Sequence, residues 1–231
     1  MSLSIPNLDN IRYIDFHTHI HKDDDRVINL FSLELEDLEL LKDQKFFSIG
    51  LHPWGLPEDL NQLDKDIANL EKALTNTQVC AIGECGLDRL RGPDMEIQKS
   101  YFTEISKLAT ETGLPLIVHC VRCFPEIISI KNKFARDSVW IIHGFNAKLT
   151  VFEQLLNHGC FISLGQAALK RNDLIDYLKV NMAALATICL ETDDSAVTIE
   201  EIYHTVAELL DISVEALSSQ MKKNFIAIFK G

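Results

Sequence analysis

The sequence predicts an α/β fold, a single-domain TIM (β/α)8 barrel with slight distortion. Its 231 residues contain about eight short apolar runs, and most of them precede a segment with the spacing of an amphipathic helix. Alternating strands and helices of this kind build a parallel sheet covered by helices, and about eight repeats close it into a barrel. The chain is 47% hydrophobic, enough for one sizeable core, so residues 1–231 are predicted to form one domain.

Each element is predicted from its apolar spacing and from the residues that end it. The predicted strands are 13–17, 26–33, 46–53, 79–84, 114–120, 138–143, 160–164 and 187–192, and residues 85–88 are predicted to turn after the fourth strand. The predicted helices are 34–45, 57–74, 95–113, 124–134, 149–158, 173–180, 199–210 and 214–229. Gly113 and Gly159 are predicted to end two of these helices, because glycine readily adopts the left-handed conformation at a helix terminus.

Composition narrows the classes of function. The net charge of −12 argues against broad attraction to nucleic acid, although a local basic patch is compatible with it. The N-terminus lacks the charged and apolar regions of a signal peptide, and no apolar run approaches the ~20 residues of a membrane helix. We therefore expect a cytoplasmic protein that contacts no membrane and is a monomer or a weak oligomer.

The six cysteines lie mostly inside apolar runs, which is typical of reduced and buried thiols rather than of a disulfide framework. Cys120 and Cys123 form a C-x-x-C pair without a second pair nearby. A redox or zinc-binding role for this pair is the minor alternative.

Ionisable residues follow the predicted strands, where a barrel carries its chemistry. In Asp15-Phe16-His17-Thr18-His19, the acid and both histidines share one face of an extended chain. The residues in this position are His17, His19, His52, Glu84, His119, His143, Glu191 and Asp193. Each alone has a structural interpretation as a hydrogen-bonded core histidine or a helix cap. Together they indicate a metal site, because buried imidazole and carboxylate groups must be paired or metal-bound.

The segments IDFHTH, GLHPW, AIGECGLD, LPLIVHC, IIHGF and LETD, in this order, resemble the TatD family of metal-dependent deoxyribonucleases, which belong to the amidohydrolase-like barrels. The resemblance runs over nearly the whole chain, including the tail from Val206 to Phe229. It implies a TIM barrel that binds divalent metal ions and cleaves phosphodiester bonds. It also implies that His52 lies near the substrate phosphate and that the metal ligands are His17, His19, Glu84, His119, His143 and Asp193.

Phosphodiester hydrolysis on this site is predicted to use two divalent ions about 4 Å apart, which activate water and stabilise the leaving oxygen. The predicted ligands are His17, His19 and Asp193 for one ion, and His119 and His143 for the other, with Glu84 bridging. Asp193 and Glu84 are the predicted catalytic residues, with Asp193 as general base. The ligand types favour Zn, Mn, Co or Fe over Mg, whereas the resemblance suggests Mg or Mn, so the metal stays open.

Other polar residues near the strand ends keep two interpretations each. Asp15 and Glu191 either accept hydrogen bonds that fix a histidine tautomer or serve the fold alone. Arg89 and Arg122 are the predicted phosphate-binding residues, with Arg91 and Lys148 as further cations, and each is otherwise a solvated loop charge.

Three functions follow from these observations. The first is a nuclease that acts on single strands or ends of DNA. The second is a hydrolase of a small ester, lactone, amide or phosphoester, because the family's basic loop after the last strand is replaced by Ala196-Val197-Thr198 followed by Glu200 and Glu201. The third is a non-enzymatic protein that retains an unused metal cage.

Overall fold

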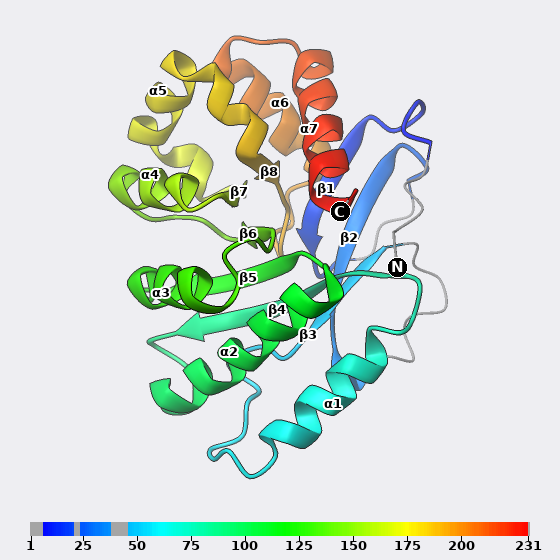
Figure 1. Cartoon of the computed structure of the whole chain (residues 1–231). Helices are drawn as coiled ribbons and strands as arrows, with labels where there is room; N and C mark the ends of the chain where they lie inside the picture. The colour runs from blue at the N-terminus through cyan, green and yellow to red at the C-terminus, as the bar shows by residue number, and fades with distance from the viewer. Residues whose placement is uncertain (1–6, 21–23, 38–45, 231) are drawn as a thin grey trace. The chain divides into compact units, whose positions relative to one another are not determined.

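A computed structural model describes residues 7–20, 24–37 and 46–230 of the chain. Its described residues contain eight strands, numbered β1 to β8 along the chain (Figure 1). The strands are β1 (Tyr13–Thr18), β2 (Val27–Glu34), β3 (Phe47–Gly50), β4 (Val79–Asp88), β5 (Leu116–Val121), β6 (Trp140–Ile142), β7 (Cys160–Leu164) and β8 (Ile188–Leu190). The registered pairs, for example β3 with β4 and β4 with β5, are parallel, which confirms the predicted α/β class.

The helices begin and end largely where the sequence predicts. They are α1 (Leu63–Ala73), α2 (Met95–Thr112), α3 (Phe124–Phe134), α4 (Leu149–Asn157), α5 (Asn172–Val180), α6 (Ile199–Leu210) and α7 (Val214–Phe229). The Asp94 side chain caps α2 by accepting from the Glu96 N–H, and Gly113 ends it with a φ of 72°. Thr198 and Glu201 form a reciprocal capping box at the start of α6. Local hydrogen-bond chemistry therefore sets these helix boundaries.

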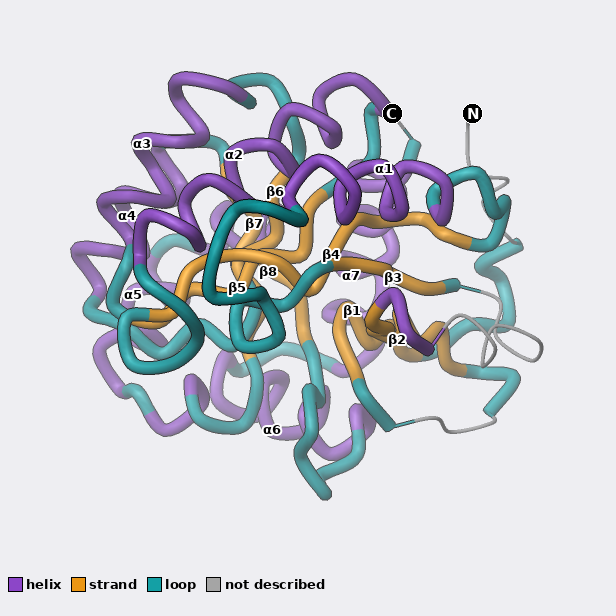
Figure 2. The backbone as a smooth tube through the Cα atoms, turned by 90° about the horizontal axis from the view of Figure 1, so that it is seen from below, coloured by secondary structure: helices purple, strands orange, loops and turns teal. Residues whose placement is uncertain are grey.

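The described chain divides into two compact units. The first, residues 32–142, contains β3 to β6 and α1 to α3. In it the helices lie outside the strands, with α2 against β4 and beside both α1 and α3 (Figure 2). Trp140, Phe47 and Tyr101 are fully buried there, so the core of this unit lies between the strands and the three helices.

The second unit comprises the chain up to residue 31 and from residue 143 onward. Its helices α6 and α7 pack on β1 and β8. The buried hydroxyl of Tyr203, on α6, accepts from the Ile14 N–H at 3.0 Å and donates to the Ile14 carbonyl at 3.1 Å. A side chain of the C-terminal region thus holds the strand that carries the His-x-His segment.

The structure corrects the prediction in several places. Strand β4 runs on to Asp88, where a turn was predicted from Cys85, because Cys85 to Asp88 pair with Val118 to Val121 of the neighbouring strand. Helix α1 starts six residues later than predicted, at Leu63 rather than residue 57. Two 3-10 helices, Ala168–Lys170 and Met182–Thr187, were not predicted. Most of the helix predicted over residues 34–45 lies outside the described residues.

Most of the cysteines are buried, as predicted from their apolar surroundings. Burial raises the pKa of the Cys80, Cys85 and Cys189 thiols, which disfavours the reactive thiolate. Among the described helices, none combines the length and apolar character that spanning a bilayer requires.

Candidate metal centre

The backbone of Asp193 is bound to the His-x-His segment of β1. The Asp193 N–H donates to the His17 carbonyl at 3.0 Å, and the Asp193 carbonyl accepts from the His19 N–H at 3.2 Å. These two bonds form a parallel bridge between Thr18 and Asp193. Asp193 has a φ of 56°, in the left-handed region that aspartate tolerates better than most residues. The bridge thus places this acid beside two histidines that lie more than 170 positions away in the sequence.

The side chains of His17, His19 and Asp193, which we call the His17 cluster, converge on one small volume. The Nε2 atoms of both histidines lie 3.6 Å from Asp193 Oδ1. This separation exceeds a hydrogen bond. It matches the roughly 3.4 Å between two ligands of a tetrahedral ion whose bonds are about 2.0–2.2 Å long. His17 is fully buried, while His19 and Asp193 are 40% and 37% exposed. The donor set therefore fits a divalent cation reached from one side.

His143 lies beside this cluster. Its ring centroid is 4.3 Å from that of His17, and its Nδ1 is 3.9 Å from Glu191 Oε1. The buried Glu191 carboxylate accepts from the Gly144 N–H at 2.5 Å. Glu191 thus orients His143 through the following backbone amide, since 3.9 Å is too long for a hydrogen bond to the ring. Control of the histidine tautomer by Glu191 stays a prediction.

Asp15, the other predicted acceptor, holds the segment just before Asp193. It accepts from the Thr192 N–H at 3.0 Å, from the Thr192 hydroxyl at 2.6 Å and from the His17 N–H at 3.4 Å. Burial raises the pKa of Asp15 to about 7, although the hydrogen bonds from Thr192 oppose this rise. These contacts favour a structural role, in which Asp15 ties the segment after β8 to β1.

His52, Glu84 and His119 form a second group, which we call the Glu84 cluster. Glu84 Oε1 lies 2.7 Å from His119 Nδ1 and 3.1 Å from His52 Nε2. The His52 Nδ1 accepts from the Trp54 N–H at 3.2 Å, so we assign the proton of the neutral ring to Nε2. His52 is therefore a hydrogen-bond donor, as its predicted place near a substrate phosphate requires. The ligand atoms of the three residues lie within 4.8 Å of one another, and with His52 protonated at Nε2, Glu84 and His119 are the two that can bind an ion.

The sequence reasoning missed Asp88, which organises this cluster. Its Oδ2 accepts from the Trp54 Nε1–H at 2.6 Å and lies 3.3 Å from His119 Nε2. Its Oδ1 accepts from the N–H groups of Leu90 at 2.7 Å and Arg91 at 3.2 Å. Burial would raise the pKa of Asp88, but these hydrogen bonds outweigh it, so the pKa lies below its usual value. Asp88 thereby directs Nε2 of His119 to itself and leaves Nδ1, next to Glu84, as the ligand atom.

A sequence signal for Asp88 existed. Residues two apart on a strand share a face, so Glu84, Gly86 and Asp88 point the same way once β4 is extended to its full length. The turn predicted at residues 85–88 concealed this alternation.

Replacing Asp88 with Asn is expected to lower the affinity for divalent metal by about 10- to 100-fold, because His119 loses the carboxylate that orients it. Competition with a chromogenic chelator measures this change. Asp176→Asn, on the exposed surface of α5, is the matched control and should bind metal like the unmodified protein. An unchanged affinity in Asp88→Asn would contradict the orienting role.

The predicted phosphate-binding arginines lie in the unit of residues 32–142. The guanidinium of Arg89 is paired with Glu126, and its Nε donates to the Arg122 carbonyl at 3.1 Å. Arg122 is exposed and has a φ of 57°. Arg89 is thus tied to the start of α3, and binding of phosphate by either arginine stays a prediction.

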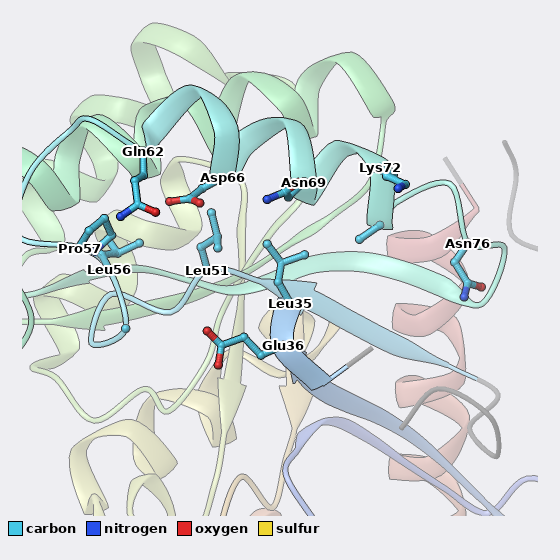
Figure 3. Close-up of a pocket in the computed structure, with 12 residues that line it drawn as sticks. Leu35, Glu36, Leu51, Leu56, Pro57, Gln62, Asp66, Asn69, Lys72 and Asn76 are labelled. Atoms are coloured by element: carbon cyan, nitrogen blue, oxygen red, sulfur yellow. The ribbon is translucent and has the colours of Figure 1, made fainter. Parts of the chain in front are cut away.

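A pocket of about 650 Å³ lies under α1 in the same unit (Figure 3). Asp66 and Asn69 extend from α1 toward Leu35 and Leu51, which form its apolar floor (Figure 3). Asp66 also accepts from the Tyr101 hydroxyl at 2.8 Å. The described lining includes none of the predicted metal ligands, so this pocket is not the metal centre.

The strands are parallel and alternate with helices, and imidazole and carboxylate groups gather after the strands. These features define a metal-dependent hydrolase of the TIM-barrel class. Comparison with known proteins agrees. The model of the TatD related DNase family matches residues 31–230, and the chain belongs to this family.

Two relatives and one solved structure illustrate the similarity. An uncharacterized metal-dependent hydrolase of Buchnera aphidicola is 28% identical over 96% of this chain and 93% of its own length. The deoxyribonuclease Tat-D of Schizosaccharomyces pombe is 27% identical over 68% of this chain and 54% of its own length. The crystal structure of YJJV, a TatD homolog from Escherichia coli, superposes with a TM-score of 0.76 at 22% identity, covering 95% of this chain and 98% of that chain. This structural likeness confirms the predicted barrel fold.

Proposed function

We propose that the protein hydrolyses phosphodiester bonds of DNA, in single strands or at strand ends, with a water molecule activated by bound divalent metal. The observation that carries the proposal is the convergence of His17, His19 and Asp193, whose ligand atoms are spaced for one cation. The Schizosaccharomyces pombe relative, named a deoxyribonuclease, supports DNA as the substrate class.

A bound divalent ion would supply Lewis-acid activation of water and of the phosphoryl oxygens. His17 and His19 would hold the ion together with Asp193, whose carboxylate is partly exposed and accepts the proton of the attacking water. In the other cluster, Nδ1 of His119 and the Glu84 carboxylate, which face each other, would hold a second ion. The Nε2–H of His52 would then donate to a phosphate oxygen. The bridging role of Glu84 and the part of His143 as a ligand belong to this proposal.

Removal of metal is expected to abolish hydrolysis of a single-stranded oligonucleotide, and addition of Mn, Mg or Zn to restore it. Metal that binds only the folded chain should also stabilise it by about 2.7 kcal/mol at a concentration one hundred times Kd. Thermal unfolding with and without metal measures this second effect. Failure to cleave any nucleic acid with any of these ions would refute the proposed function.

A hydrolase of small esters, lactones, amides or phosphoesters is the second candidate, and the net charge of −12 favours it. The acidic residues Glu200 and Glu201 after β8 are weaker evidence for a small substrate than the sequence suggests. Glu201 caps α6, and Glu200 accepts from the Tyr13 hydroxyl at 3.1 Å, so both serve the fold. A panel of small substrates assayed at matched metal concentration separates the candidates: turnover of DNA alone eliminates this one.

We further propose that the protein is cytoplasmic, that residues 1–231 form a single domain, and that the protein is a monomer or a weak oligomer. Light scattering of the protein in solution measures its oligomeric state, and a stable large oligomer would contradict the proposed monomer or weak oligomer.

A further inference from the structure

The loop between β3 and α1 exposes an aromatic ring beside the Glu84 cluster. Trp54 is 47% exposed, whereas Trp140, the other tryptophan, is fully buried. The ring centroid of Trp54 lies 4.7 Å from that of His52 and 5.7 Å from that of His119. Leu90, in the loop after β4, is 61% exposed. An exposed aromatic ring in contact with a predicted metal ligand and a predicted substrate-binding residue indicates a binding surface rather than chance exposure.

The ring of Trp54 is held in place. Its Nε1–H donates to Asp88, and the guanidinium carbon of Arg91 lies 4.4 Å from its centroid. Gln98 fixes the loop that carries Arg91, because its Nε2 donates to the carbonyls of Asp88, Arg91 and Pro93 at 2.9–3.0 Å. Trp54 and Arg91, together with Leu90 from the same loop as Arg91, are what we call the Trp54 platform. A partly buried hydrogen-bond network supports it.

We propose that the Trp54 platform stacks an unpaired nucleobase of the substrate, next to the phosphodiester that is cleaved. Exposed aromatic rings and planar guanidinium groups are the surfaces on which proteins stack bases of single strands, without regard to base identity. The positive charge of Arg91 also attracts a polyanion locally. The protein as a whole does not attract one, because its net charge is −12. The inference rests on the proposed function and adds to it the requirement for an unpaired base. A base within a duplex cannot stack on the platform, so single strands and frayed ends are selected.

Two substitutions of Trp54 separate the aromatic face from the Nε1–H. Trp54→Phe and Trp54→Leu both lose the hydrogen bond to Asp88, and only Trp54→Leu loses the ring. We expect KM for a single-stranded oligonucleotide to be about 5- to 100-fold higher in Trp54→Leu than in Trp54→Phe, the range that stacking of one base contributes. The kcat values of the two variants should agree within about threefold, since stacking binds ground and transition states equally. Equal KM values in the two variants would overturn the inference.

An oligonucleotide with abasic sites on both sides of the cleaved bond supplies the matched substrate control. The two variants should have the same KM for it, because the platform has no base to stack. A persistent difference between the variants on this abasic substrate would mean that Trp54 acts on the sugar-phosphate backbone, and the inference would fail.

Fluorescence separates failure of this inference from failure of the proposed function. With chelator present to prevent turnover, a single-stranded oligonucleotide should quench the emission of Trp54, whereas the buried Trp140 should be unaffected. Trp54→Phe, which retains only Trp140, is the control and should show no quenching. Quenching without cleavage under any metal would refute the nuclease while retaining base binding. Cleavage without quenching, and with equal KM values in both variants, would retain the nuclease and refute the platform.

Discussion

Replacing Asp193 with Asn is expected to lower kcat/KM for DNA hydrolysis by about 10²- to 10⁴-fold, the contribution of a positioned general base. The amide retains an oxygen that binds metal but cannot take a proton from water. The backbone bonds of residue 193 to His17 and His19 do not depend on the side chain, so the fold should persist. Steady-state kinetics on a single-stranded oligonucleotide measure the loss.

Metal content distinguishes the two roles of Asp193. If the carboxylate acts as the base, Asp193→Asn retains bound metal while losing activity. If it acts only as a ligand, metal and activity are lost together and excess metal restores both. His204→Gln, at an exposed position of α6, is the control and should retain full activity. Full activity in Asp193→Asn would exclude both roles.

Replacing Gly86 with Ala is expected to destabilise the protein by about 3 kcal/mol or more, which is the range of severe core mutations. A Cβ atom at this position would lie 2.0 Å from the His119 carbonyl oxygen, and the φ of 147° is one that side chains rarely adopt. Gly86 pairs directly with His119 between β4 and β5, so relief of the clash must separate these strands. Glu84 and His119, which these same two strands carry, should lose metal affinity as well.

Urea denaturation measures the free energy of unfolding of this variant. Gly55→Ala is the matched control, since a Cβ atom there would be no closer than 3.8 Å to its neighbours. Its stability should lie within about 1 kcal/mol of the unmodified protein. If Gly86→Ala fails to fold while the control folds normally, the prediction of a destabilised protein is also confirmed. Equal stability of the two variants would show that the strands accommodate the extra carbon.

The order of strands and helices was predictable because each element leaves a local pattern in the sequence. Helices α3, α6 and α7 have the predicted bounds, since their apolar spacing, and for α6 and α7 a capping side chain directly before the helix, are local to the segment. Strand ends were less predictable. Whether Cys85 to Asp88 form a turn or continue β4 depends on the partner strand, which no local window contains.

The residue types of the candidate site were also predictable, because imidazole and carboxylate groups stand out after apolar runs. The roles of the individual residues were less predictable. Arg89 is recognisable as a cation near a strand end, yet its pairing with Glu126 arises from a helix almost forty positions away. Trp54 gave no signal of its own, since exposure of an aromatic ring is a property of the folded surface.

Residue type and periodicity along the chain are enough to predict the fold class, the order of elements and the kinds of groups available to bind metal. The folded chain was needed to show that Asp193 stands between His17 and His19, and that Asp88 joins Trp54 to His119. Hydrogen bonds and ligand distances act over a few ångströms in space. Their partners are therefore set by strand pairing rather than by proximity in sequence.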